Sequence, residues 1–176
     1  YFWKRLSSYL LRRRQRKDVL SRRAGVRAAG CKKKVLFARF LKNENSGELN
    51  ILDSISDIEV LHLEKSYGFY KTLTEKEKKE VKKLYEALWN EVLRKVSGGS
   101  YDVLVMDEFM AAYRYGLIPN EEALCFLEKK PTGLEVVLTG RDPDLRLVEK
   151  ADYVSEICKV KHPYDRGIRA RRGIEY

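Results

Sequence analysis

The sequence predicts an α/β domain in which a mainly parallel sheet carries helices on both faces. Short apolar segments alternate with segments of helical spacing over most of the chain. Such alternation requires crossover connections, which set the strands parallel and place the helices on the two faces. A chain of 176 residues, 44% of them hydrophobic, is long enough for one well-buried core and short for two.

Each expected element has its own local signal. Apolar runs bounded by turn residues predict strands. Thr74, followed three residues later by Glu77, forms a capping box that begins a helix, and glycines at 98–99 and 116 close two of the helices. We expect strands at residues 35–41, 58–63, 101–108, 134–140 and 153–160, a turn at 43–47, and helices at 74–97, from 109 to 115, 119–129 and 143–150.

The positive charge of the chain is confined to one end. The net charge is +10, and residues 1–34 hold 13 Lys or Arg against one acid, which is +12, so residues 35–176 carry 10 − 12 = −2. A basic chain can bind nucleic acid, but a near-neutral body gives no reason to expect it. We therefore expect nucleic acid as a partner only if the basic N-terminal segment is genuine.

Composition argues against several classes of protein. No apolar run approaches the roughly 20 residues that cross a bilayer, and the N-terminus lacks the apolar core and cleavage site of a signal peptide. Three distant cysteines and two histidines form no CxxC pair and no zinc-site pattern. We therefore expect a cytoplasmic protein with free or buried thiols and no membrane partner.

Asp107 and Glu108 end the clearest predicted strand. An apolar run that delivers a carboxylate to the edge of the sheet has the form of a Walker B strand, in which the carboxylate holds Mg²⁺. Ligands of parallel sheets bind at the carboxyl ends of the strands. The alternative is that these acids cap the helix that follows.

The motif Thr139-Gly140-Arg141 ends a second predicted strand. A glycine there permits close backbone approach, and an arginine is a forked donor that suits phosphate. The alternative for Arg141 is a surface ion pair with Asp142 or Asp144.

The C-terminal segment, residues 160–174, is the most informative part of the chain. It mixes apolar, aromatic and charged residues, with Gly167 and Gly173 at fixed points. This composition differs from that of a solvated tail and is typical of a segment folded onto a ligand site.

These segments together resemble the ATP:corrinoid adenosyltransferases that modify cobalamin. The resemblance implies a RecA-like P-loop fold, ATP and a corrinoid as substrates, Mg²⁺ as cofactor, a homodimer, and a reducing flavoprotein as partner. The implied reaction transfers the 5′-deoxyadenosyl group of ATP to the Co(I) of a reduced corrinoid and releases triphosphate. The likeness covers about 85% of the chain, from residue 27 onward, and rests on residues 35–42, 46–49, 106–108, 115–117, 136–141 and the C-terminal segment.

The same resemblance implies roles for residues on the nucleotide side. Asp107 and Glu108 would hold Mg²⁺. The motif Thr139-Gly140-Arg141 would bind the nucleotide, with Arg141 acting in catalysis on the triphosphate. Lys17 falls where the lysine of the family's phosphate loop belongs.

On the corrinoid side, Phe69 matches an aromatic residue that shields the corrinoid and acts in catalysis. The family's Trp position falls on Lys71, or on Tyr70 if the alignment shifts by one residue, and ordinary packing is the alternative for Tyr67, Phe69 and Tyr70. Three residues of the C-terminal segment would line the nucleotide or corrinoid pocket, although a lone histidine is more often structural: Lys161, His162 and Asp165.

The phosphate loop of this family is absent from the chain as written. It precedes an Arg-Ala-Ala-Gly helix end, present at residues 27–30, and counting back places it on residues 12–19, which are Arg-Arg-Arg-Gln-Arg-Lys-Asp-Val. Without glycine this segment cannot form the backbone cradle that holds phosphates. Suitable codons for the same residues, shifted by one base, encode Gly-Glu-Gly-Lys-Gly-Lys-Thr-Ser. We therefore hypothesise that residues 1 to about 25 are translated out of frame.

The chain then divides into an anomalous basic segment, residues 1–26, and one α/β domain, residues 27–176. On this hypothesis residues 1–25 pack poorly or form a helix unlike the family's strand and loop, and the sheet lacks its first strand. The alternative is a genuine basic extension. Two rival functions remain: a non-catalytic P-loop-fold relative whose basic arm binds nucleic acid, and a P-loop ATPase that hydrolyses ATP without a corrinoid.

Overall fold

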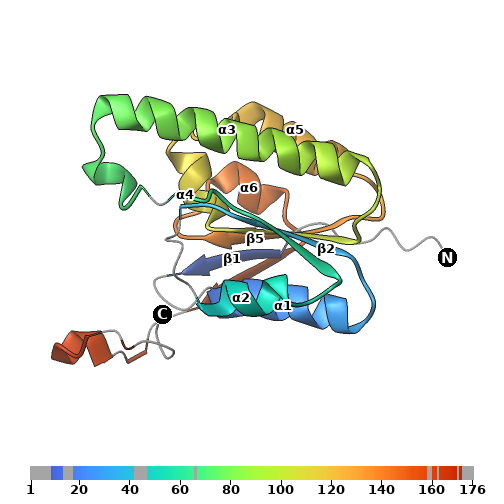
Figure 1. Cartoon of the computed structure of the whole chain (residues 1–176), viewed down its shortest axis with the longest axis horizontal. Helices are drawn as coiled ribbons and strands as arrows, with labels where there is room; N and C mark the ends of the chain where they lie inside the picture. Colours follow the sequence, from blue (N-terminus) through green and yellow to red (C-terminus); the bar gives the residue numbers. More distant parts are fainter. Residues whose placement is uncertain are drawn as a thin grey trace.

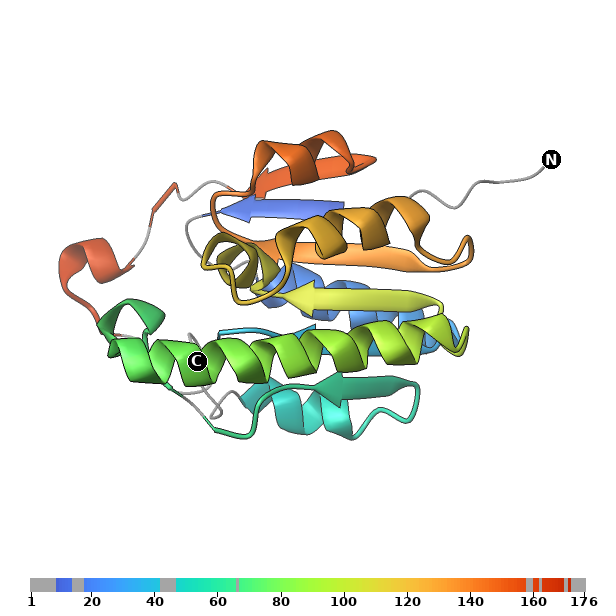
Figure 2. The ribbon, with the colours of Figure 1, turned by 90° about the horizontal axis from the view of Figure 1, so that it is seen from above.

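Six parallel strands form one sheet in the part of the chain that the structure, a computed structural model, describes. Helices cover both faces of this sheet (Figure 1), and the strand order is β3-β2-β4-β5-β1-β6 (Figure 2). This arrangement confirms the predicted RecA-like α/β fold. The residues described are 9–13 and 18–20 (backbone only), 21–41, 47–65, 67–157, 160–161, 163–169 and 171.

The five strands and four helices whose ranges were predicted appear in the expected order, together with elements that were not predicted. The strands are β1 Tyr9–Arg13, β2 Val35–Arg39, β3 Ile58–Leu61, β4 Val103–Asp107, β5 Glu135–Gly140 and β6 Tyr153–Ile157. The helices are α1 Asp18–Gly30, α2 Gly47–Asp53, α3 Glu75–Ser97, α4 Phe109–Arg114, α5 Asn120–Lys129 and α6 Leu145–Glu149, with short 3₁₀ helices η1 Tyr70–Thr72 and η2 Pro163–Arg166.

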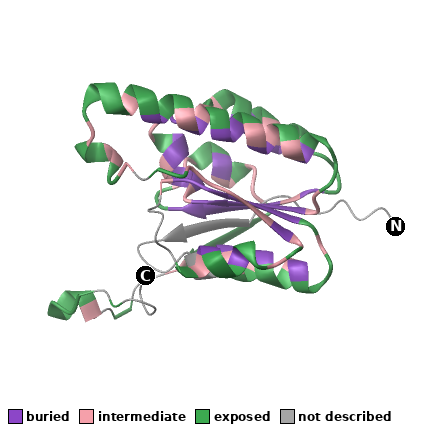
Figure 3. Ribbon diagram, viewed as in Figure 1, coloured by how far each residue is buried: buried purple, intermediate pink, exposed green. Residues whose placement is uncertain are grey.

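The sheet separates two hydrophobic clusters. Helices α1 and α2 cover one face, and α3, α4, α5 and α6 cover the other (Figure 1). Every residue of β2 and β4 is buried, as expected for strands covered on both faces (Figure 3). Along β2 and β4, alternate residues belong to the two clusters, because successive side chains of a strand point to opposite faces.

Helix α3 is the longest element and begins as the sequence predicts. Thr74 is its N-cap, and the Glu77 backbone N–H donates to the Thr74 hydroxyl at 3.3 Å while the Thr74 N–H donates to Glu77 at 2.8 Å. Trp89 is fully buried on its inner face, and its indole N–H donates to Glu122 of α5 at 2.8 Å. This bond joins the two long helices on that face of the sheet.

One helix of the fold was not predicted from the sequence. Helix α2 was not expected, and it begins at Gly47, the last residue of the predicted turn. The rest of that turn, residues 43–46, lies outside the described residues. Helix α2 buries only Leu49 and Leu52, so its apolar signal spans fewer than two turns, too short to give a clear periodicity.

The expectation of a missing first strand was wrong, whereas the expectation that residues 1–25 pack poorly falls largely on residues 1–8 and 14–17 and on side chains before residue 21, which lie outside the description. Residues Tyr9–Arg13 form strand β1, which pairs with β5 on one side and β6 on the other. The physical reason is the apolar run Tyr9-Leu10-Leu11, which meets the requirement for a strand inside the sheet although basic residues surround it. Helix α1 follows as the first crossover connection.

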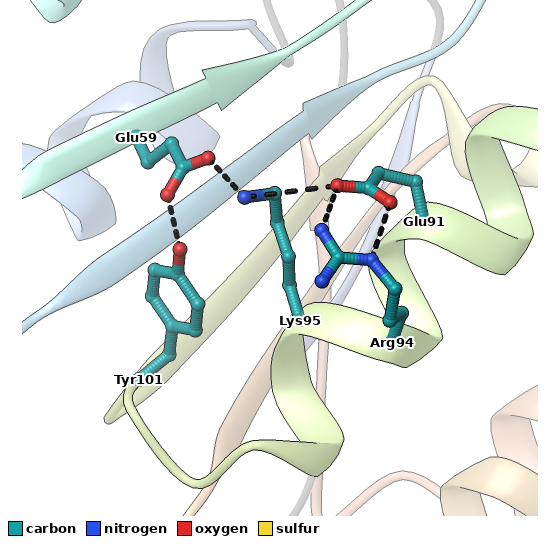
Figure 4. A network of polar contacts seen from close by, with 5 residues as sticks. All are labelled: Glu59, Glu91, Arg94, Lys95 and Tyr101. Atoms are coloured by element: carbon teal, nitrogen blue, oxygen red, sulfur yellow. Dashed lines mark hydrogen bonds and ion pairs between the residues drawn. The ribbon is translucent and has the colours of Figure 1, made fainter.

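A polar network joins the C-terminal part of α3 to edge strand β3 (Figure 4). Glu59 of β3 accepts from the Tyr101 hydroxyl and lies 2.6 Å from Lys95, while Arg94 and Lys95 both pair with Glu91. The hydrogen bond from Lys95 holds the pKa of Glu59 below its ordinary value. None of the described helices is long and apolar enough to cross a membrane.

We expect Tyr101→Phe to remove one source of alkaline destabilisation. Burial, with the hydrogen bond to Glu59, raises the pKa of Tyr101 to about 12, whereas an unfolded tyrosine titrates near about 10. The neutral phenol therefore contributes stability that is complete below pH ~10 and is lost as the pH rises through the folded pKa. Urea unfolding at several pH values from 9 to 11 would measure the free energy of unfolding of both chains. The excess of the parent over the variant should decrease as the pH rises. A difference that stays constant over this range would contradict the assignment.

Candidate functional site

Asp107 is the centre of a polar cluster at the carboxyl end of β4. It is 1% exposed, and its Oδ1 accepts hydrogen bonds from the Ser21 hydroxyl of α1 at 3.1 Å and from the Thr139 hydroxyl of β5 at 2.7 Å. Two donors offset part of the cost of burying the carboxylate and fix its orientation. The cluster therefore holds a charged oxygen ligand at the end of the sheet at which parallel folds bind nucleotides.

Arg39 places a second buried charge beside Asp107. It ends β2, is 4% exposed, and is the register partner of Asp107 across the β2–β4 pair. In β2 and β4, Phe37 and Val105 belong to the cluster under α1, so Arg39 and Asp107, two residues further along, share that face. Arg39 and Ser21 were not predicted from the sequence as site residues. A charged residue that closes an apolar strand was the available signal for Arg39.

Glu108 takes a left-handed backbone conformation immediately after Asp107. Its φ is 59°, and its backbone N–H donates to the Thr139 hydroxyl at 3.2 Å. It is the N-cap residue of α4 but makes no side-chain cap hydrogen bond, so the alternative that this acid caps the helix does not describe the structure. A left-handed non-glycine residue costs about 1–2 kcal/mol, and such strain is typical of functional positions.

Gly140 is required by the packing of α4 against β5. A Cβ atom at this position would lie 2.4 Å from Met110 Cβ and 2.9 Å from the Met110 backbone nitrogen. The close approach expected at this glycine is thus made by a helix of the protein itself. It fixes the start of α4, and with it Glu108, against the end of β5.

Arg141 is exposed, and the two acids proposed as its surface partners pair with other arginines. Asp142 lies 3.1 Å from Arg114, and Asp144 lies 3.2 Å from Arg146. Within the described part of the chain Arg141 has no ion pair or hydrogen bond. Its guanidinium is therefore available to an anion at the end of β5.

The three aromatic residues before α3 divide into two that pack and one that does not. Tyr67 donates its hydroxyl to Glu80 at 3.0 Å, and the ring of Tyr70 stacks on Tyr115. Phe69 is 81% exposed. Packing therefore accounts for Tyr67 and Tyr70, and Phe69 remains a candidate contact for a ligand.

In the described part of the C-terminal segment, helix η2 lies apart from the Asp107 cluster. Lys161 and Asp165 are exposed, and Figures 1 and 2 show η2 outside the α/β body, on the side at which the strands end. The predicted site residues His162 and Lys17 lie outside the described residues, as does Cys158, while Cys31 and Cys125 are free and exposed.

The oxygen donors of the cluster suit a cation that arrives with a nucleotide. Among the described residues no three His, Cys, Asp or Glu side chains converge as a metal site. Mg²⁺ is usually bound by one or two carboxylates together with substrate phosphates and waters. Asp107, Glu108 and Thr139 supply hard oxygen donors of that kind, so they fit Mg²⁺ better as part of a nucleotide complex than as an all-protein cage.

Known proteins resemble this chain over most of its length. The family described as ATP:corrinoid adenosyltransferase BtuR/CobO/CobP matches residues 23–176. The corrinoid adenosyltransferase of Escherichia coli (strain K12) is 31% identical over 153 residues, 86% of this chain and 75% of that protein. The corrinoid adenosyltransferase CobA of Salmonella typhimurium is 34% identical over 90 residues (51% and 46%), and that of Sinorhizobium sp is 37% identical over 92 residues (52% and 43%).

We expect Gly140→Ala to destabilise the protein and to displace α4. Any Cβ at this position collides with Met110, including its backbone, so relief requires movement of the helix and not of one flexible side chain. Overpacking of this kind costs about 1–3 kcal/mol, which urea unfolding would measure. Gly30→Ala is the matched control, because nothing lies within 4 Å of a Cβ there. Equal stability of the two variants would contradict this account.

Proposed function

We propose a function from one premise: the chain belongs to the ATP:corrinoid adenosyltransferase family. The protein is accordingly a transferase. We propose that it transfers the 5′-deoxyadenosyl group of ATP to the cobalt of a reduced corrinoid, in the synthesis of adenosylcobalamin. The match over residues 23–176 carries this proposal, and the buried Asp107 cluster at the strand ends supports it.

The proposed reaction requires no nucleophile from the protein. Co(I) of the reduced corrinoid donates an electron pair to C5′ of ATP, a Co–C bond forms, and the C5′–O bond breaks. Triphosphate leaves with that bonding pair, and the cobalt becomes formally Co(III). Since the substrate supplies the nucleophile, the protein has to align the two substrates and stabilise the leaving group. A reducing partner, which we propose to be a flavoprotein, would supply Co(I).

On the nucleotide side, Asp107 and Glu108 would hold Mg²⁺ with the triphosphate, and the ion would neutralise charge on the leaving group. Thr139 orients Asp107 and Glu108 through its two hydrogen bonds. Arg141, exposed at the end of β5, would donate to phosphate oxygens. In the sheet, β5 lies between β4, which ends at Asp107, and β1, which leads into the segment expected to hold the phosphates. Arg141 directly follows β5 and therefore lies between these two parts of the site.

On the corrinoid side, Phe69 would cover the corrin ring and exclude water from the cobalt. Its 81% exposure on a structured turn supports this role, because a large apolar side chain otherwise gains by burial. We propose that Lys161, His162 and Asp165 complete the pocket when the C-terminal segment folds over bound substrate.

The missing phosphate loop gives the sharpest test. We expect the chain as written to bind MgATP weakly, and a variant in which residues 12–19 are replaced by Gly-Glu-Gly-Lys-Gly-Lys-Thr-Ser to bind it at least about 100-fold more tightly. The restored loop supplies several charge-assisted hydrogen bonds of about 1.5–3 kcal/mol each. Calorimetric titration with MgATP would give the affinities, and absorbance of the Co–C product with a chemical reductant would give the transfer rate.

Other outcomes would favour the rival functions. Equal ATP affinity in the two chains would contradict the loop hypothesis. Phosphate release by the loop-restored chain without corrinoid adenosylation would favour an ATPase. Salt-sensitive binding of the unmodified chain to nucleic acid, with no ATP binding in either chain, would favour a binding module with a basic arm.

In the chain with the restored phosphate loop, we expect Phe69→Ala to lower kcat/KM for the corrinoid by about 10- to 100-fold, since a buried phenyl ring contributes about 1.5–3 kcal/mol. The KM for ATP should stay within about twofold. Ile51→Ala is a matched control, because Ile51 is another exposed apolar side chain, 64% exposed on α2. A rise in the KM for ATP equal to that for the corrinoid would count against a corrinoid contact at Phe69.

A further inference from the structure

We infer that Tyr70 and Tyr115 are positioning residues that hold Phe69 at a fixed place relative to Asp107 and Glu108. The inference rests on the proposed function, because it takes Phe69 as a corrinoid contact. The two tyrosines would then set the spacing between the corrinoid side and the nucleotide side of the site.

The two tyrosines form a stacked pair. Their ring centroids are 4.6 Å apart and their planes meet at 26°, within the preferred range for offset aromatic stacking. Both side chains are partly buried against the hydrophobic cluster under α3. A stacked pair anchored to the core has little freedom to move, so the backbone of Tyr70 is tied to the end of α4.

The turn that carries Phe69 is held by its own hydrogen bonds. The Phe69 carbonyl accepts from the Thr72 backbone N–H at 2.9 Å and from the Thr72 hydroxyl at 2.8 Å. The Leu73 N–H donates to the Tyr70 carbonyl at 3.3 Å, and the next residue, Thr74, is the N-cap of α3. The backbone after Phe69 thus runs without a break into the longest helix, while its ring stays exposed.

Tyr115 connects this turn to the acid pair. It is the C-cap of α4, whose six residues follow directly after Asp107 and Glu108. At 1.5 Å per residue the helix spans about 9 Å, and Met110 locks it against Gly140. A short fixed helix and one aromatic stack therefore set the separation between Phe69 and the carboxylates.

Such a fixed spacing has a chemical purpose in a transfer between two bound substrates. Productive attack requires the reacting atoms to lie about 3–3.5 Å apart and in line, so the corrinoid contact and the triphosphate contacts have to keep a constant separation. The stack also settles which aromatic residue faces the ligand. In residues 67–71, Tyr67 and Tyr70 are partly buried, Lys71 is exposed, and Phe69 is the one exposed aromatic residue.

The Arg114 cation over the ring of Tyr115 contributes less to this arrangement. The Arg114 guanidinium lies 5.4 Å from the ring centroid and pairs with Asp142 at 3.1 Å. Both side chains of that pair are more than 40% exposed, and exposed ion pairs contribute about 0–1 kcal/mol. The stack, and not the ion pair, is therefore the connection to test.

The test is a double-mutant cycle on corrinoid affinity. Cob(II)alamin without a reductant binds but cannot react, so its absorbance titration gives Kd directly. We expect Tyr70→Ala and Tyr115→Ala each to raise Kd by about 3- to 10-fold, the worth of one aromatic pair. Tyr70→Phe, which keeps the stack, should stay within about twofold, as should the control Tyr153→Ala on edge strand β6. On a Phe69→Ala background, Tyr70→Ala should have no further effect.

Two results would overturn the inference. The first is a Tyr70→Phe variant as weak as Tyr70→Ala. The second is a Tyr70→Ala effect that adds in full to that of Phe69→Ala, because a residue that acts through Phe69 has nothing to position once Phe69 is gone. Tyr70→Leu, which keeps apolar bulk without a ring, replaces the alanine variant if that variant does not fold. No cob(II)alamin binding by the unmodified chain would overturn the proposed function itself.

Discussion

The contact between Gly140 and Met110 is the constraint on which the geometry of the site depends. Met110 of α4 packs directly against the backbone of Gly140 at the end of β5. The two lie closer together than a residue with a Cβ atom at position 140 would allow. Because α4 begins beside the Asp107–Glu108 pair and ends at Tyr115, one helix fixes both the carboxylates and the platform on which Tyr70 stacks. The left-handed conformation of Glu108 is the local cost of turning the chain from strand to helix in so short a space.

The polar cluster around Asp107 is assembled by neighbouring strands of the sheet and by α1. Neighbouring parallel strands bring Arg39, Asp107 and Thr139 to the carboxyl end and to one face of the sheet, and α1, which covers that face, adds the Ser21 hydroxyl. Four polar side chains, each no more than 4% exposed, thus lie where an apolar core would otherwise continue. A buried charged group is costly unless it is paired or hydrogen-bonded. For Asp107, the hydrogen bonds from Ser21 and Thr139 offset part of that cost.

The N-terminal segment supplies a strand to the sheet but lacks the glycines of a phosphate-binding loop. Strand β1 lies inside the sheet between β5 and β6 and is level with the Thr139-Gly140-Arg141 motif. A buried strand requires an apolar run, and a helix requires residues with ordinary helix propensity. A basic segment can contain both. A phosphate-binding loop requires glycines at fixed positions, and residues 12–19 contain no glycine. Strand β1 and helix α1 thus form with the basic sequence, whereas a phosphate loop of the family's type requires glycines that this sequence lacks.

The sequence by itself determined the α/β class, the position of five strands, the capped start of α3, and the arrival of Asp107, Glu108 and Thr139 at strand ends, because each depends on local periodicity and on the residues at element boundaries. The roles of the site residues, by contrast, came from the family resemblance and stay predictions. Only the tertiary structure decided that β1 completes the sheet, that Arg39 and Ser21 join Asp107, and that Tyr70 packs while Phe69 stays exposed. Strand order, register and ring stacking join residues distant in the chain, and no local pattern records which of them meet.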